Sequence, residues 1–495
     1  MNELHFPFIE CTIFTPLLGA LVVSRMKDPF EARKWSVVFT GLAFCFALGA
    51  WQDFGLLQFA GHQAFDAEDR WHLLAKVFNR EIFTIDQLSA PLLPLAALLY
   101  FLTTFATLRT KIRRFSFTLM LVGEAILLAT FSCKIPGLIV ALLVLGVLPP
   151  YLEMRARGTS TRLYVLHMGL FVALLVFGFW RTWAEGAQVT HSNFAVVPLL
   201  VAILIRSGIA PFHTWMTDLF ERATFGSALL FVTPMVGAYG AIRLVLPAAS
   251  DELLRNFGVM SLVTAVYASG MALVQRDARR FFCYIFLSHS SLVLVGLELT
   301  TPVGLTGALC VWLSVGVALG GFGLTLRALE SRRGRLSLVE FQGLYEHTPE
   351  LACCFVVTGL ASVGFPGTVG FVGSELLVDG AVSIYPWIGP AVVVAAALNG
   401  IALVKAYFVL FTGTRYSSSI SLGIGPREKW AVLSLAALIL IGGMIPQYNV
   451  ISRFHAATEI LAHRKLPLHP ERERAKHAAA VVNGTDFELA TAPHP

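Results

Sequence analysis

Long apolar runs alternate with short polar and basic segments along this chain. A membrane-crossing helix needs about 20 predominantly apolar residues. By this criterion the sequence predicts about 14 spans, at 7–23, 35–51, 83–108, 115–133, 135–152, 163–180, 201–227, 228–246, 259–274, 281–297, 303–326, 351–380, 387–411 and 430–444. The predicted fold class is an all-α polytopic membrane protein.

Basic clusters follow mainly the odd-numbered spans, the first, third, fifth, ninth and eleventh. The positive-inside rule places these loops in the cytoplasm, and therefore the N-terminus and the polar segment 52–80 outside. An even number of spans also places the C-terminus outside, although segment 453–477 is rich in Arg, Lys and His. Either the count is wrong by one span, or this late charge cluster crosses regardless.

Composition agrees with the membrane assignment and excludes soluble classes. Hydrophobic residues make up 56% of the 495 positions and charged residues 14%, with a mean hydropathy of +0.70, far from the soluble average. The net charge of +6 resides in short loops, which favours topology over nucleic-acid binding. The seven cysteines form no CxxC pair, and no nucleotide, iron-sulfur or haem motif is present. We therefore expect no cofactor and no metal.

Two of the predicted spans are interrupted by glycine and proline, at 208–211 and 364–373. They fall at comparable places in successive groups of about five spans, which is typical of inverted repeats surrounding an ion pathway. The alternative is that these small residues only allow close helix packing. The predicted divisions are N-terminal helices and an outside loop (1–114), a first repeat (115–247), a second repeat (257–413), a final helix (414–446) and a basic, partly disordered tail (447–495).

Ionisable residues inside membrane spans are costly and commonly functional. The predicted ion-pathway residues are Glu124, Arg206, His213, His289, Glu375, Asp379 and Lys405, and the predicted helix breaks are at Pro211 and Pro366.

Each pathway residue also has a structural alternative. Arg206 and Glu124 could pair on the pathway or form a purely structural buried pair. His289, beside two serines, suits a proton relay because imidazole donates and accepts near neutral pH, but lone core histidines are common. His213 could bridge the half-helices through water or cap the carbonyls freed at the break.

The remaining three candidates lie in the second repeat. Glu375 and Asp379 are four residues apart, hence on one helical face, where they could share a proton or flank the helix end as solvated charges. Lys405 could line a channel, or its side chain could extend to the cytoplasmic surface.

Three motifs resemble the proton-translocating antiporter-like family, which includes membrane subunits of respiratory complex I, membrane-bound hydrogenases and multisubunit sodium/proton antiporters. They are PFHTWMTDLFERATFGSALL from Pro211, DARRFFCYIFLSHSSLVLVGL from Asp277 and LASVGFPGTVGFVGSELL from Leu360. The segment FTIDQLSAPL is similar to a further family motif. The resemblance covers most of 83–413 and implies two inverted five-helix repeats, each with a broken helix.

The chain also departs from the family pattern. Arg206 stands where relatives have a lysine, and Val144 stands near the place of a glutamate. The basic residues of two later helices are replaced near Phe231 or Met235 and near Leu319. Arginine stays charged at any working pH, so it is a poor proton carrier. The resemblance therefore implies a proton or cation pathway with a depleted charged axis.

The resemblance also sets the functional expectations. The leading hypothesis is a proton-translocating subunit of a multisubunit energy-coupling complex in the bacterial inner membrane, partnered by other membrane subunits. The chain would have no catalytic site of its own, but could belong to an NADH-quinone oxidoreductase-like or hydrogenase-like complex. One alternative is the membrane subunit that energises inorganic-carbon uptake with a large zinc-containing, carbonic-anhydrase-like partner. The other is a non-conducting scaffold.

Overall fold

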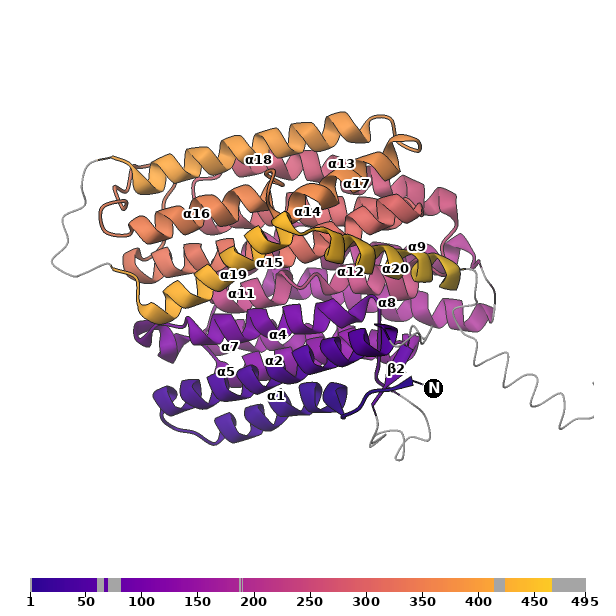
Figure 1. The fold of residues 1–495 in the computed structure, drawn as a ribbon, viewed down its shortest axis with the longest axis horizontal. Coiled ribbons are helices and arrows are strands. Elements are labelled where there is room, and N and C mark those ends of the chain that lie inside the picture. The colour runs from indigo at the N-terminus through magenta and orange to yellow at the C-terminus, as the bar shows by residue number, and fades with distance from the viewer. Residues whose placement is uncertain are drawn as a thin grey trace, which may run out of the picture.

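The computed structural model describes residues 2–59, 66–69, 82–186, 188, 190–413 and 423–464. Figure 1 shows helices lying roughly side by side, with the N-terminal helices at one edge of the bundle and α18 at the other. The helices are α1 (Phe8–Ser24), α2 (Pro29–Phe59), α4 (Ser89–Phe105), η1 (Arg109–Arg114), α5 (Phe117–Phe131), α6 (Pro136–Gly146), α7 (Leu148–Ala156), α8 (Arg162–Glu185), α9 (Asn193–Ser207), α10 (Thr214–Arg222), α11 (Phe225–Val232), α12 (Val236–Gly240), the π-helical turn η2 (Ala241–Val245), α13 (Asp251–Leu273), α14 (Ala278–Glu298), α15 (Pro302–Arg333), α16 (Pro349–Ser362), α17 (Val369–Val382), α18 (Ile388–Phe411), α19 (Pro426–Met444) and α20 (Gln447–His463).

The predicted all-α polytopic class is confirmed. Within the described ranges, eight helices are long and apolar enough to cross a membrane, and α19 with α20 forms a further candidate span bent by 80°. Five shorter apolar helices accompany them. If each of these also contributes a crossing, the number equals the predicted fourteen, but that count stays a prediction.

Both predicted helix breaks are present. The α9 helix ends at Ser207 and α10 begins at Thr214, while α16 ends at Ser362 and α17 begins at Val369. Gly208 follows α9 with φ 74°, a left-handed conformation that glycine adopts readily. Trp215 Nε1 reaches back across the first break and donates to the Ile205 carbonyl over 2.8 Å. A protein side chain therefore supplies a hydrogen bond to a backbone carbonyl that lipid would leave unsatisfied.

A third interruption, between α11 and α12, was not predicted from the sequence. Thr233, Pro234 and Met235 separate the two helices, and Met235 has φ 53°, which is uncommon for a residue with a side chain. The Pro234 carbonyl accepts a hydrogen bond from Trp312 Nε1 of α15 over 3.1 Å. This interruption places Met235 beside the end of α9.

The centre of the bundle consists of α14 and α15. In the apolar stretch of each helix, 94% of the residues are buried in α14 and 89% in α15. The same fraction is only 33% in α2 and 28% in α8. Small residues allow α15 and α17 to touch backbone to backbone, since a Cβ added at Gly307 would lie 2.3 Å from Leu377 N. The two central helices therefore carry the polar groups most shielded from lipid.

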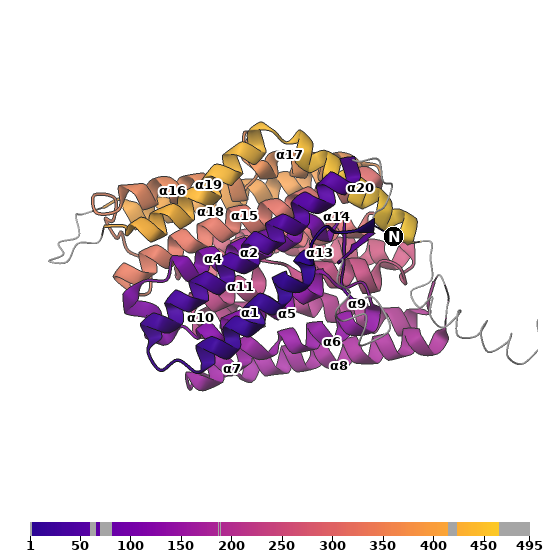
Figure 2. The same cartoon turned by 60° about the horizontal axis from the view of Figure 1, so that its bottom comes forward.

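The last two helices cross the surface of the bundle and meet at a bend (Figure 2). Arg332 at the end of α15 pairs with Glu428 at the start of α19 over 2.5 Å. Arg464, just after α20, pairs with Asp251 at the start of α13 over 2.6 Å. The first part of the segment expected as a tail, 447–463, is thus the helix α20, and it leads the chain to the end of the bundle where the N-terminus lies (Figure 1). Residues 465–495 lie outside the described residues.

A small sheet and an ionic network close the N-terminal end of the bundle. Strands β1 (Asn2–Glu3), β2 (Asp66–Glu68) and β3 (Thr84–Asp86) are ordered β1-β2-β3, with a parallel first pair and an antiparallel second pair. Asp86 accepts from Arg243 at 2.5 Å and lies 2.8 Å from Lys134 Nζ. Of the predicted outside loop 52–80, residues 52–59 belong to α2 and 66–68 to β2, and most of the remainder lies outside the described residues.

Candidate ion pathway

A cavity of about 240 Å³ lies at the second helix break; we name it the His289 cavity. Its lining includes His289 of α14, Asn399 of α18, Ser362 at the end of α16 and Glu375 of α17. A single water molecule needs only about 10–15 Å³ of such space together with polar partners. The His289 cavity therefore has room for several hydrogen-bonded waters.

His289 is held in a polar contact between α14 and α18. Its side chain is buried, and its Nε2 atom lies 3.5 Å from Asn399 Nδ2. The same Asn399 nitrogen donates to Ser288 Oγ over 2.9 Å, and Ser288 donates in turn to the Ala265 carbonyl over 2.8 Å. Asn399 Oδ1 is buried and has no protein hydrogen-bond partner within the described part of the chain. The imidazole is thus fixed in place, with an acceptor beside it that water could satisfy.

The opening of the His289 cavity is marked by Glu375, which is exposed although it lines the cavity. The α17 helix runs antiparallel to the first part of α15, because Thr301 Oγ1 donates to the Gly380 carbonyl over 2.9 Å and Gly307 contacts Leu377. The other end of α15 carries the basic residues that the positive-inside rule places in the cytoplasm. With that topology, the His289 cavity belongs to the outer half of the membrane.

A second cavity, of about 60 Å³, lies at the first break; we name it the Arg206 cavity. Its lining includes Arg206 of α9, Tyr100 of α4, Ser227 of α11 and Glu153 of α7. Glu153 accepts from the Thr224 amide over 2.9 Å and lies 3.6 Å from Arg157. Because basic residues predicted to be cytoplasmic follow α7, the Arg206 cavity extends toward the inner side.

Arg206 itself is only 5% exposed and is held mainly by aromatic rings. Its guanidinium carbon lies 3.9 Å from the Phe231 ring centroid and 5.9 Å from that of Trp215. One terminal nitrogen, Nη2, donates to the Phe231 carbonyl over 3.2 Å. A cation over an aromatic face is stabilised electrostatically, more strongly where water is excluded.

A void of about 10 Å³ adjoins the Arg206 cavity at Arg206; we name it the connecting void. It is lined by Arg206 and Met235 on one side and by Phe286 and Ser290 of α14 on the other. Ser290 directly follows His289 in the sequence. A space of this size is at or below the about 10–15 Å³ that one water needs. The void is therefore a dry contact that borders Arg206 and the α14 residue next to His289.

The predicted pair between Glu124 and Arg206 is not formed, so this part of the sequence interpretation is wrong. Glu124 on α5 is fully buried, and both of its carboxylate oxygens are without a hydrogen-bond partner in the described part of the chain. Arg206 contacts Phe231 instead. The rings on α10 and α11 occupy the face of the guanidinium, which residue types and spacing alone did not indicate.

His213 lies outside the three spaces defined above. Its Nε2 atom is 3.3 Å from the Tyr267 hydroxyl, and its ring packs edge-on against Tyr267. The carbonyl at the break is met by Trp215 rather than by His213. Whether His213 conducts stays a prediction.

Lys405 and Asp379 are both exposed and line none of these spaces. Lys405 Nζ donates to the Leu273 carbonyl at the end of α13 over 3.0 Å, which is the arrangement expected for a side chain that extends to the membrane surface. Asp379 lies one helical turn beyond Glu375, toward the end of α17.

The structure adds several polar groups that the sequence prediction did not select. Asn399, Glu153, Tyr100 and Ser290 all line one of the three spaces. Asn399 had a usable signal, because an amide within an apolar span is costly unless it finds a partner. For Tyr100 and Ser290 we find no comparable sequence signal.

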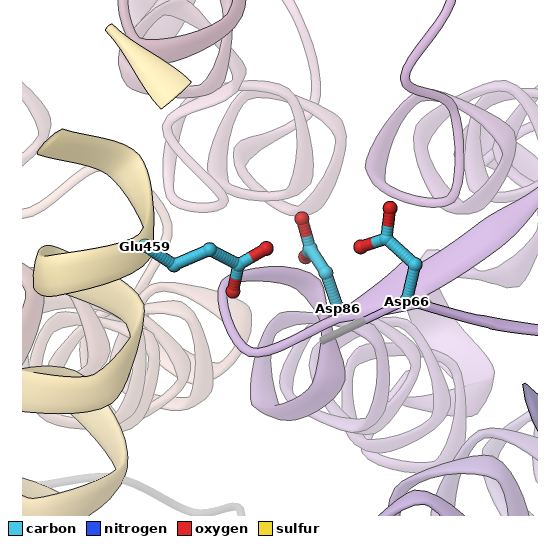
Figure 3. A group of neighbouring side chains, drawn as sticks. All are labelled: Asp66, Asp86 and Glu459. Carbon is cyan, nitrogen blue, oxygen red and sulfur yellow. The ribbon is translucent and has the colours of Figure 1, made fainter. Parts of the chain in front are cut away.

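The residues best suited to hold a metal lie elsewhere, at the N-terminal end of the bundle. Figure 3 shows the carboxyl groups of Asp66, Asp86 and Glu459 close together. Lys134 Nζ contacts all three, and Arg243 also pairs with Asp86. Burial alone raises the pKa of the Asp86 carboxyl, but the adjacent Arg243 and Lys134 charges outweigh it and hold this pKa well below its usual value. The carboxylates thus already have cationic partners.

Comparison with known proteins finds similarity to the family that the sequence motifs resemble. A family profile described as "NADH:quinone oxidoreductase/Mrp antiporter, TM" matches residues 163–399, which include the first break, His289 and Asn399. The NAD(P)H-quinone oxidoreductase chain 4 of Gloeobacter violaceus is 26% identical over 490 residues, which cover 89% of this chain and 90% of that protein. Over these residues the chain is similar to the proton-translocating antiporter-like family. The resemblance seen in the sequence motifs is confirmed.

Other antiporter-like proteins match over different lengths. NADH-quinone oxidoreductase subunit M of Rickettsia prowazekii is 28% identical over 271 residues, so the chain spans about half of that relative, 55% of its length. Among solved structures, a chain of the Dietzia sp. Mrp complex has a TM-score of 0.80 at 17% identity, covering 92% of this chain and 97% of its own. A chain of Thermus thermophilus respiratory complex I has a TM-score of 0.76 at 21% identity, covering 92% and 99%. These similarities confirm the fold of a polytopic antiporter-like subunit.

Proposed function

We propose that this antiporter-like chain translocates protons as one membrane subunit of a multisubunit energy-coupling complex in a bacterial inner membrane. The observation that carries this proposal is the burial of His289 beside a cavity with room for several waters, at a helix break, next to Asn399 and behind Glu375. Imidazole is the side chain best suited to accept and donate protons near neutral pH. The relatives named as quinone oxidoreductase and antiporter subunits support the same function.

The proposed route has two water-filled halves joined at the centre. From the outer side, protons pass Glu375 and the waters of the His289 cavity to reach His289. From the inner side, the Arg206 cavity leads past Glu153 toward the connecting void. Transfer between Ser290 and the Arg206 side requires the dry contact to admit water transiently. Glu375, His289 and Arg206 are the predicted pathway residues that line these spaces.

Arg206 serves in this route as a fixed positive charge rather than as a carrier. Its guanidinium stays protonated at working pH, so it cannot hand on a proton. A fixed cation near a relay disfavours a second positive charge there, and conformational changes that alter its distance would change the proton affinity of the relay. Glu124, His213, Asp379 and Lys405 remain predicted pathway residues outside the three spaces.

The driving reaction takes place on partner subunits in this proposal. The sequence carries no cofactor motif, and the relatives are named as subunits of oxidoreductases or occur in multisubunit membrane complexes. These relatives favour proton translocation over an inorganic-carbon system with a zinc-containing partner, for which neither the fold nor the matches provide support. A non-conducting scaffold is the outcome that the following experiment would reveal.

The test is proton flux in vesicles that contain the complex purified through a tag on this chain. An imposed membrane potential drives the flux, and an enclosed pH-sensitive dye reports it. We expect His289→Ala to lower the flux by about 100-fold, the lower end of the contribution of a positioned proton-transfer group. The control is His167→Ala, because His167 is half-buried on α8 and lines none of the three spaces. Equal flux in both variants and the wild type would refute the proposed route.

A further inference from the structure

The Arg206 guanidinium is a buried charge without an acidic counterpart. None of the ion pairs in the described part of the chain includes Arg206, and its one hydrogen bond goes to the neutral Phe231 carbonyl. Aromatic rings stabilise a cation only in part, and isolated buried charges are strongly disfavoured. Two other arginines of the bundle are better supported: the buried Arg453 donates to the Leu88 and Gln87 carbonyls, and the half-buried Arg327 donates to the Thr103 carbonyl and the Thr107 hydroxyl.

Hydrogen-bond donors gather around the space next to Arg206. The Tyr100 hydroxyl lines the cavity and has no hydrogen-bond partner among the described residues, although Tyr100 is only 5% exposed. The Ser227 hydroxyl accepts from Thr224 Oγ1 over 2.9 Å, which leaves its own proton free to donate. Arg206 and two hydroxyl-bearing residues therefore line the same otherwise largely apolar cavity.

The acidic groups nearby do not supply the missing negative charge. Glu153 lines the same cavity, but its carboxylate accepts from the Thr224 amide and lies beside Arg157. Glu124 neighbours Gly123, which lines the cavity, but the Glu124 side chain is not part of that lining. The space at Arg206 is thus bordered by a permanent cation whose counter-charge the described protein does not provide.

We propose that the Arg206 cavity binds one small monovalent inorganic anion of the size of chloride, held by Arg206 and by the Tyr100 and Ser227 hydroxyls. The cavity of about 60 Å³ is several times the about 10–15 Å³ that one water requires, so it admits such an ion. Binding to the planar guanidinium and to neutral donors is charge-assisted. The anion compensates a charge that a lysine at this position could lose by deprotonation but that arginine retains.

The test measures anion binding directly on the purified full-length chain or its complex in detergent. Equilibrium dialysis with radioactive chloride, in sodium gluconate at constant ionic strength, is expected to give one saturable site per chain. Replacing gluconate by chloride is also expected to raise the midpoint of thermal unfolding, because a ligand that binds only the folded state stabilises it. Nitrate and bicarbonate compete in parallel samples to identify which small anion binds most tightly.

Variants locate the site. Arg206→Gln should abolish saturable chloride binding, whereas Arg327→Gln, which removes another membrane-embedded arginine, should retain it. Tyr100→Phe deletes a single donor and should weaken binding by about 2- to 10-fold. Because this variant keeps the bulk of the side chain, it carries the test if Arg206→Gln does not fold.

No saturable binding by the wild type, or undiminished binding in Arg206→Gln or Tyr100→Phe, would overturn the proposal. Binding is measured without a proton gradient, so its absence would leave the proposed proton route unaffected. Conversely, loss of flux in His289→Ala says nothing about chloride. The two proposals therefore fail independently.

Discussion

The Asn399 amide donates from Nδ2 to the Ser288 hydroxyl over 2.9 Å and thereby ties the middle of α18 to α14 beside His289. Both side chains are completely buried in the bundle. Asn399 Oδ1 has no protein partner within the described residues, yet it borders a cavity large enough for water. The amide is thus placed to orient both the histidine and the waters that reach it.

Replacing this amide should impair conduction more than folding. We expect Asn399→Leu, which keeps the side-chain volume but removes the donor and acceptor, to lower proton flux about 10-fold or more, since a misplaced relay loses much of its contribution. Flux per assembled complex is measured in vesicles. Ser291→Ala is the control, because Ser291 is buried on α14 close to His289 but donates to the Leu287 carbonyl. Equal flux in the two variants would contradict the assigned role.

The Asp86 carboxylate should stabilise the protein independently of pH over the physiological range. A carboxyl with a lowered folded-state pKa stabilises fully above its unfolded pKa of about 3.9 and loses that contribution only as the pH falls through the folded value. We therefore expect this contribution to stay constant between about pH 8 and 5 once Glu459, the other buried carboxyl near Lys134, is replaced by Gln in both proteins. Thermal unfolding of Glu459→Gln and of the double variant Asp86→Asn/Glu459→Gln across this range should show a nearly constant difference.

The stability lost in Asp86→Asn follows from the two positive charges that the substitution leaves without a carboxylate partner. Asp86→Asn removes the carboxylate between Arg243 and Lys134, and breaking a buried ion pair costs about 3–5 kcal/mol. Asp28→Asn, at an exposed loop position, should change the free energy of unfolding by less than about 0.5 kcal/mol. A stability difference that vanishes at pH 5 would show that another group, with a higher pKa, controls the network.

The contact between α15 and α17 should not tolerate even one added carbon. A Cβ at Gly307 would lie 2.3 Å from Leu377 N and 2.7 Å from Leu377 Cα, both backbone atoms. Gly307→Ala should therefore destabilise the protein by about 1–3 kcal/mol, the usual effect of overpacking. Gly169→Ala serves as the control, because a Cβ there meets nothing within 4 Å. The midpoints of thermal unfolding in detergent compare the two, and equal midpoints would contradict the close helix contact.

The sequence predicted the breaks and the family but not the contacts around the charged axis. Glycine and proline at 208–211 and 364–367 act locally on the backbone, so their effect can be read from the chain alone. The contact of Asn399 with Ser288 joins residues 111 positions apart and depends on how α18 packs on α14. Arg206 was expected to find Glu124, because charge suggests a carboxylate partner, but the neighbouring helices present Phe231 and Trp215. Which side chains contact one another in the core thus depends on how the helices pack, which the local sequence does not show.

The connecting void should limit proton transfer between the two polar cavities. Met235 lines this void from the third interruption, opposite Phe286 and Ser290, and the space of about 10 Å³ is too small to keep a water there stably. Met235→Ala removes most of the side chain and should let water join the Arg206 and His289 cavities. We expect passive proton leak through vesicles containing the complex to rise several-fold, without any driving reaction.

The matched control for that leak is Met168→Ala. Met168 is equally buried, on α8, but lines none of the three spaces. Both substitutions create a cavity and should lower stability by about 2–5 kcal/mol. A general loosening of the fold would raise the leak in both variants, whereas opening of the connecting void raises it only in Met235→Ala.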